Sequence, residues 1–166
     1  MKRICWLMLI VTSMGAFAGP QTTPASADFR QLQALAGNWE GTDDHGMPVK
    51  TNFKLIVSET AVMETLAASD MHEMVTLYSV DRDGIALVHY CPTNNQPRMR
   101  ALPSPGAREL VFTFQDAGNL ASVADGHEHK LVFEFLDKDH INEHWTWRKG
   151  TKETESTFHL ARVKGK

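Results

Sequence analysis

Two histidines separated by one residue form the pattern in this sequence that is closest to a metal site. On a β-strand, His127 and His129 would share one face, and two imidazoles so placed can bind one metal ion. His89, Cys91 or Glu143 would supply further ligands from neighbouring strands. A metal-dependent enzyme that uses His127 and His129 is therefore one hypothesis for the function.

A second group of polar residues surrounds a predicted hairpin turn. His89, Tyr90 and Cys91 end a predicted strand, and two Asn, a Gln and Arg98 follow them. Donors and acceptors that converge in this way can orient a ligand. Alternatively, the amides bond to the loop backbone. Arg98 would pair either with Glu143 or with a carboxylate or phosphate of a ligand, because its planar guanidinium suits both partners.

Other functional patterns are missing from the sequence. His89 and Cys91 are two residues apart, but no acid that would orient them as a nucleophile and base is identifiable. No phosphate-binding loop, Gly-x-Ser-x-Gly elbow or dinucleotide fingerprint occurs. Lys and Arg are scattered among Asp and Glu, without the basic stripe that nucleic acids require. The sequence therefore favours a binding role over catalysis, and no nucleic-acid partner is expected.

Short β-strands must position these side chains. From Trp39 onward, apolar and polar residues alternate in short runs that turn formers such as the Asp-Arg-Asp-Gly of 81–84 separate. Closing eight to ten such strands on themselves removes exposed edges. The sequence thus predicts an all-β fold, a single antiparallel barrel. Its predicted strands are 38–42, 49–58, 61–67, 73–81, 85–91, 98–102, 109–114, 129–137, 140–148 and 153–162.

A short helix is expected ahead of the strands. Asp28 precedes Phe29, Leu32 and Leu35, whose spacing is typical of a helix with an N-cap and one apolar face, ending near Gly37. Residues 19–27 are small, polar and proline-bearing, which is typical of a flexible leader. No repeat or second composition block follows, so residues 28–166 are predicted to form one domain.

The first 18 residues have the three parts of a secretory signal peptide. Lys2 and Arg3 precede an apolar run at 4–11, and an Ala-x-Ala sequence ends at Ala18, the predicted cleavage site. The apolar run is shorter than the roughly 20 residues that cross a bilayer, so no transmembrane segment is expected after cleavage. We expect a periplasmic or secreted protein.

Cleavage would change the charge and the cysteine content of the chain. Without Lys2 and Arg3, 15 basic residues remain beside 20 acidic ones, a net charge of −5 with His neutral. Cys91 would be the one remaining cysteine, so no internal disulfide is expected in an oxidising compartment. The hydrophobic core must therefore hold the fold together.

Three segments carry a resemblance to a known kind of barrel. Residues 32–41 (LQALAGNWEG) resemble the start of a lipocalin-like (calycin) barrel, in which a Gly-x-Trp on the first strand closes one end beneath a short helix. Residues 87–99 (LVHYCPTNNQPRM) and 140–147 (HINEHWTW), with a final Phe-His-Leu strand at 158–160, are similar to uncharacterised exported bacterial proteins of lipocalin-like type. The resemblance is therefore to a domain of unknown function.

The resemblance implies a lipocalin-like barrel and export. It also implies that Trp39 plugs one end and packs against the basic side chain of a late strand, either Arg148 or Arg162. The chain resembles the nitrobindin-like haem-binding barrels at the first strand but lacks their Gly-x-Gly-x-Tyr-Pro continuation. The identity of any cofactor stays open.

The expected role is to bind a small apolar or amphipathic molecule inside the barrel, because an eight-stranded barrel has room for one such ligand. Tyr78, His89 and Arg98 would orient the ligand, and apolar side chains would enclose it. A metal-binding barrel enzyme and a structural or protein-interaction barrel without a ligand are the alternatives. The predicted lining residues are Met74, Thr76, Tyr78, His89, Arg98, Met99, Phe133, Glu143, Trp145 and Trp147.

Overall fold

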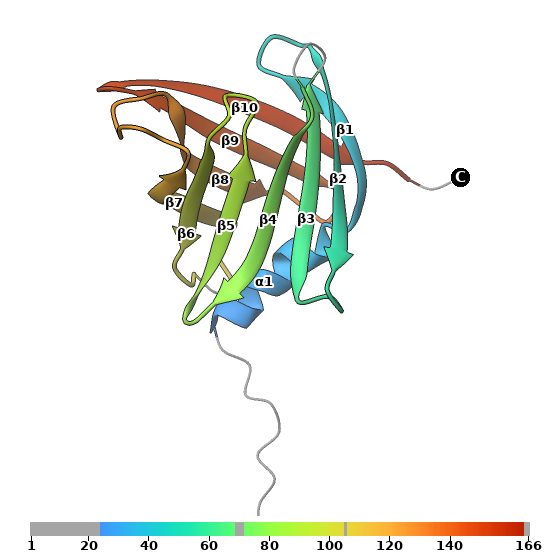
Figure 1. Ribbon diagram of the computed structural model, residues 1–166. Helices are drawn as coiled ribbons and strands as arrows, with labels where there is room; N and C mark the ends of the chain where they lie inside the picture. Colours follow the sequence, from blue (N-terminus) through green and yellow to red (C-terminus); the bar gives the residue numbers. More distant parts are fainter. Residues whose placement is uncertain (1–23, 69–71, 105, 165–166) are drawn as a thin grey trace, which may run out of the picture.

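The computed structural model describes residues 24–68, 72–104 and 106–164. Within these ranges, ten antiparallel strands close into a barrel in which each strand pairs with its neighbour in the chain and β1 pairs with β10 (Figure 1). The predicted all-β antiparallel barrel with a short N-terminal helix is confirmed. The elements are α1 (Pro24–Ala34), β1 (Gly37–Asp43), β2 (Pro48–Ile56), β3 (Ala61–Ala68), β4 (Met74–Asp81), β5 (Gly84–Tyr90), β6 (Gln96–Ala101), β7 (Glu109–Gly118), β8 (His127–Phe135), β9 (His140–Lys149) and β10 (Lys152–Arg162).

The helix differs most from its prediction. Helix α1 begins at Pro24, inside the predicted leader, and so includes residues 24–27. Proline suits the first turn of a helix because its missing N–H would have no helical partner there. The predicted signal peptide at 1–18 and leader residues 19–23 lie outside the described residues. Within the described ranges, no helix has the length and hydrophobicity needed to cross a bilayer.

Asp28 therefore lies within α1 and does not cap it. Its Oδ2 accepts a hydrogen bond of 2.7 Å from the backbone N–H of Ser104, in the connection between β6 and β7. Leu32 and Leu35, the apolar residues predicted for this helix, are buried against the barrel. Figure 1 shows α1 lying across the lower end of the barrel, which it closes.

The core consists of side chains that alternate inward along each strand. Its centre is a cluster of aromatic rings in which Phe53 lies 6.2 Å from Phe133, and Tyr78 lies 5.7 Å from Phe112 and 5.8 Å from Phe133. These four side chains come from four different strands and are no more than 1% exposed. Burying each ring contributes roughly 3 kcal/mol to folding, so the cluster fixes the strands around one centre.

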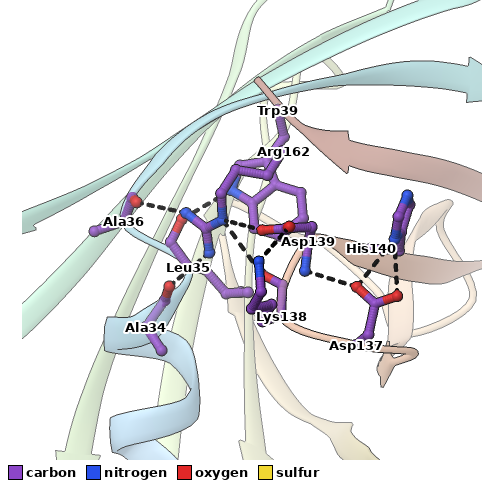
Figure 2. Close-up of polar contacts among 9 residues, drawn as sticks. All are labelled: Ala34, Leu35, Ala36, Trp39, Asp137, Lys138, Asp139, His140 and Arg162. Atoms are coloured by element: carbon purple, nitrogen blue, oxygen red, sulfur yellow. Dashed lines mark hydrogen bonds and ion pairs between the residues drawn. The ribbon is translucent and has the colours of Figure 1, made fainter. Parts of the chain in front are cut away.

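Trp39 and Arg162 join the helix to the two strands that close the barrel (Figure 2). Trp39 Nε1 donates to the Leu35 carbonyl at 2.8 Å, and the Arg162 guanidinium lies 4.3 Å from the centroid of the Trp39 ring system. Arg162 also donates to the carbonyls of Ala34 and Ala36 at 2.7 and 2.9 Å. A cation at a helix C-terminus satisfies carbonyls that have no helical donor.

The expectation that Trp39 packs against Arg148 or Arg162 is thus met by Arg162. Arg148 instead pairs with Glu153 across the turn between β9 and β10. Gly37 makes the contact with Arg162 possible, because its φ of +130° turns the chain from helix to strand. A Cβ there would also lie only 3.4 Å from Arg162 Nη1.

We expect Arg162→Ala to lower the free energy of unfolding by about 2 kcal/mol, because it removes hydrogen bonds from a charged donor and the stacking on Trp39. Arg98→Ala is the matched control, since Arg98 forms an ion pair with Asp116 on the exposed outer face. Its loss should cost less than about 1 kcal/mol. Urea denaturation measures both values. Equal effects of the two substitutions would contradict this account of the closed end.

Candidate functional site

A cavity of about 280 Å³ lies in the barrel at the end away from α1. It is formed by the end of β3, the starts of β4, β8 and β10, parts of β5 and β9, and the hairpin between β1 and β2. Its inner wall is mostly apolar and aromatic, and its rim is acidic. The lining residues are Asp43, Asp44, His45, Leu66, Ala68, Met74, Thr76, His89, Glu128, Trp145, Trp147, Glu155, Ser156 and Phe158.

Half of the predicted lining residues line this cavity. They are Met74, Thr76, His89, Trp145 and Trp147. A further four point into the barrel but pack in its core and do not line the cavity; these are Tyr78, Met99, Phe133 and Glu143. These nine residues therefore point into the barrel as predicted, and their depth along the barrel determines whether they line the cavity or pack in the core.

Arg98 does not enter the barrel, and the proposed pairing with Glu143 is wrong. Its neighbours Pro97 and Met99 on β6 point inward, so Arg98 points outward. There it pairs with Asp116 of β7, and its side chain is about half exposed. Adjacent residues of a strand, such as Arg98 and Met99, point to opposite faces. The strand pattern of the sequence therefore already argued against a lining that contains both residues.

His89 lines the cavity and has an unpaired ring nitrogen. Its Nδ1 lies 2.9 Å from Thr76 Oγ1, and its ring packs against Trp145 at an interplanar angle of 45°, with 4.6 Å between centroids. Its Nε2 is buried and has no hydrogen-bond partner among the described residues. Burial lowers the pKa of His89 to about 4, so the ring is neutral at physiological pH.

Thr76 holds the His89 ring in place from the core side. It also interacts with Tyr78, whose pKa it lowers. A neutral imidazole carries one N–H and one lone pair, so one of the two ring nitrogens donates and the other accepts. The Nε2 atom is the one left without a partner among the described residues.

Two glutamates share the barrel core beneath the cavity. Glu64 Oε1 accepts from Thr51 at 3.0 Å and its Oε2 from Tyr78 at 2.6 Å, while Glu143 Oε2 accepts from Trp145 Nε1 at 3.1 Å. Both side chains are fully buried, and burial raises both pKa values, that of Glu143 well above its usual range. Repulsion from Glu64 raises the pKa of Glu143 further.

Glu143 therefore keeps its proton and bonds to Glu64, which has two other donors. Glu143 Oε1 accepts no hydrogen bond from the described residues, which agrees with a protonated carboxyl group. Sequence reasoning selected Glu143 but missed Glu64. The signal was present, because Glu64 shares the face of Val62 and Leu66 on β3 and had to be buried with them.

Nine of the fourteen lining residues were not predicted, and Glu128 is the one whose inward direction the strand pattern contradicts. A register shift between Glu128 and Lys130 interrupts the alternation of β8. Glu128 pairs with Trp147, so both side chains face the cavity. Its Oε2 is buried without a partner among the described residues, and burial raises the pKa of Glu128 to about 7.

The two histidines of the metal-site hypothesis do not line the cavity. His127 is buried just before the bulge, whereas His129 lies within it and is partly exposed. His127 Nε2 lies 3.2 Å from His129 Nδ1, and His127 Nδ1 lies 2.8 Å from the carbonyl oxygen of Asp125. Both rings also contact Phe114. In the part of the chain that the structure describes, no three His, Cys, Asp or Glu side chains are grouped so as to hold a metal ion.

The amides of the polar hairpin bond chiefly to loop backbone. Asn95 Nδ2 donates to the Gly126 carbonyl at 2.8 Å, which ties this hairpin to the start of β8. The hairpin also forms part of a second, outer hollow, which meets the cavity at Met74, Glu128 and Trp147. Cys91 lines this outer hollow and accepts a hydrogen bond from Thr93.

No family model matches the sequence, and no curated protein is significantly similar to it. Solved structures do share its fold. Rv2717c from M. tuberculosis superposes with a TM-score of 0.61 at 15% identity, over 82% of this chain and 97% of that one. A protein of unknown function from the DUF3598 family of Nostoc punctiforme superposes with a TM-score of 0.54 at 10% identity, over 80% of this chain. The match spans about half the length of the Nostoc protein (49%).

The shared proton predicts a pH-dependent stability. Because the folded-state pKa of Glu143 is raised above its usual 4.5, the folded protein keeps a proton that the unfolded chain loses above that pH. This contribution is complete at low pH and declines as pH rises toward the folded-state pKa, by up to about 1.4 kcal/mol per pH unit. Glu143→Gln keeps a donor for Glu64 but cannot ionise, so its stability should decline less over this range.

Urea denaturation from about pH 5 to about pH 8 measures this slope. His89 and Glu128 titrate in the wild type and the variant alike, so the difference between the two curves reports on the coupled pair of Glu64 and Glu143. Glu109→Gln, on the exposed face of β7, is the control and should follow the wild type. Parallel curves for the wild type and Glu143→Gln would show that Glu143 does not retain the proton.

Proposed function

We propose that this is an exported protein that binds a small apolar or amphipathic molecule in the cavity of a lipocalin-like barrel. The observation that carries the proposal is the cavity itself, which combines an aromatic wall with buried polar atoms that lack partners. Trp145 and Trp147 form that wall, and His89 Nε2 and Glu128 Oε2 are the unpaired atoms. Binding pockets usually join these two features.

The unpaired atoms distinguish this cavity from a packing defect. A buried polar atom without a hydrogen-bond partner costs about 1–3 kcal/mol, and a defect lined by hydrocarbon carries no such cost. A ligand that forms a hydrogen bond with His89 or Glu128 recovers that free energy on binding. The volume of about 280 Å³ is near the lower end of the usual range for ligand pockets, so the ligand is small.

We assign a lipocalin-like barrel because one end of the barrel is packed and the other end holds a cavity. Trp39, Arg162 and α1 fill one end, as the resemblance at residues 32–41 implies, while the cavity occupies the other. The likeness to solved structures supports the barrel fold. Export rests on residues 1–18, whose basic start, apolar run and Ala-x-Ala end form a secretory signal.

Ligand binding can be tested by filling the cavity. We expect residues 19–166 to bind 1-naphthylmethanol, a small neutral aromatic probe, in isothermal titration calorimetry. Ala68→Phe places a ring in the cavity and should weaken binding at least tenfold. Ala67→Phe, on the outer face of the same strand, should change affinity less than twofold.

Circular dichroism and thermal unfolding establish that both variants are folded before they are compared. Equal weakening by the two substitutions would mean that the probe binds outside the barrel. A wild-type protein that binds no probe would contradict the proposed function.

Export can be tested separately. When the full chain is produced in a Gram-negative bacterium, we expect the protein in the periplasmic fraction with Gly19 as its first residue, by intact mass. Ala18→Arg should block cleavage and leave the full chain membrane-associated, because the position before the cut requires a small residue. A full-length wild-type protein in the cytoplasm would contradict export.

A further inference from the structure

We propose, building on the proposed function, that the cavity selects a positively charged aromatic ligand, an organic ammonium ion. Two independent features point to this chemistry, namely the hydrogen-bonding character of the buried groups and the charges of the lining residues.

The first feature is that two buried polar groups of the lining lack hydrogen-bond partners. His89 is 2% exposed, and its Nε2 has no partner among the described residues. Glu128 Oε2 also lacks a partner there, and an ionised carboxylate can only accept. A ligand that satisfies Glu128 must bring an N–H or O–H donor, and an ammonium group carries three.

The second feature is the charge of the lining. Four of its side chains are carboxylates, and none of the lining residues is Lys or Arg. At the rim, Asp44 Oδ2 accepts from the Thr157 N–H, and Glu155 lies 3.9 Å from Lys130. Glu128 has no such partner, so it is the carboxylate available to a ligand in the cavity.

The aromatic wall adds to the attraction of a cation. Trp145 and Trp147 line the cavity beside Glu128. The face of an indole attracts a cation that lies within about 6 Å of the ring centroid. An anionic ligand would instead meet Glu128 with no compensating cation, at the cost of desolvating both charges.

Glu128 also couples the binding of a cation to proton release. Burial places its pKa at about 7, and a bound ammonium ion would lower that pKa by favouring the carboxylate. The other titratable groups that line the cavity are Asp43, Asp44 and His45 from the β1–β2 hairpin, His89 from β5 and Glu155 from β10. His89 stays neutral because its pKa is about 4.

The test compares three probes that share one ring and one methylene, and differ in charge. They are 1-naphthylmethylammonium, 1-naphthylmethanol and 1-naphthylacetate, titrated by calorimetry into residues 19–166 at about pH 7.5, where Glu128 is largely ionised. We expect the ammonium probe to bind at least tenfold more tightly than the alcohol, and the acetate at least tenfold more weakly. In buffers of different ionisation enthalpy, the ammonium probe should release protons.

Glu128→Gln should remove the advantage of the ammonium probe and its proton release, while the alcohol still binds. Glu155→Gln is the matched control at the rim and should retain most of that advantage. Alcohol binding without preference for the ammonium probe would overturn the inference and leave the proposed function intact. If none of the probes binds, both are overturned. An ammonium preference that survives Glu128→Gln would also overturn the inference, because the selectivity would then lie elsewhere.

Discussion

The interior of this barrel depends on one constraint, the burial of two interacting carboxyl groups, those of Glu64 and Glu143. Both cannot be ionised there, so Glu143 keeps a proton and donates it to Glu64. Tyr78 donates to the same Glu64, and Trp145 donates to Glu143. These hydrogen bonds hold two large rings in place, and one of them, Trp145, lines the cavity.

The same network reaches the cavity through one hydroxyl. Thr76 lies between Tyr78 and His89, and its Oγ1 is 2.9 Å from His89 Nδ1. His89 is thereby held with its Nε2 unpaired. The position of this lining residue is therefore fixed from the core, and not from the rim.

The two ends of the barrel differ in how they are packed. Trp39 and Arg162 join α1 to the strands that close the barrel, and this end is packed. The other end keeps a cavity with buried polar atoms, which costs folding free energy. A domain held by its core alone can retain such a site because the packed end compensates for its cost.

The sequence by itself determined the strands, because a period of two between turn formers is a local pattern. It also determined the inward faces that carry Met74, Thr76, His89, Trp145 and Trp147. Only the tertiary structure decided that Glu128 and not His129 faces the cavity, since a bulge depends on how neighbouring strands pair. It also decided which inward residues form the core and which line the cavity, because depth along a barrel follows from strand stagger and closure, and these have no local sequence signal.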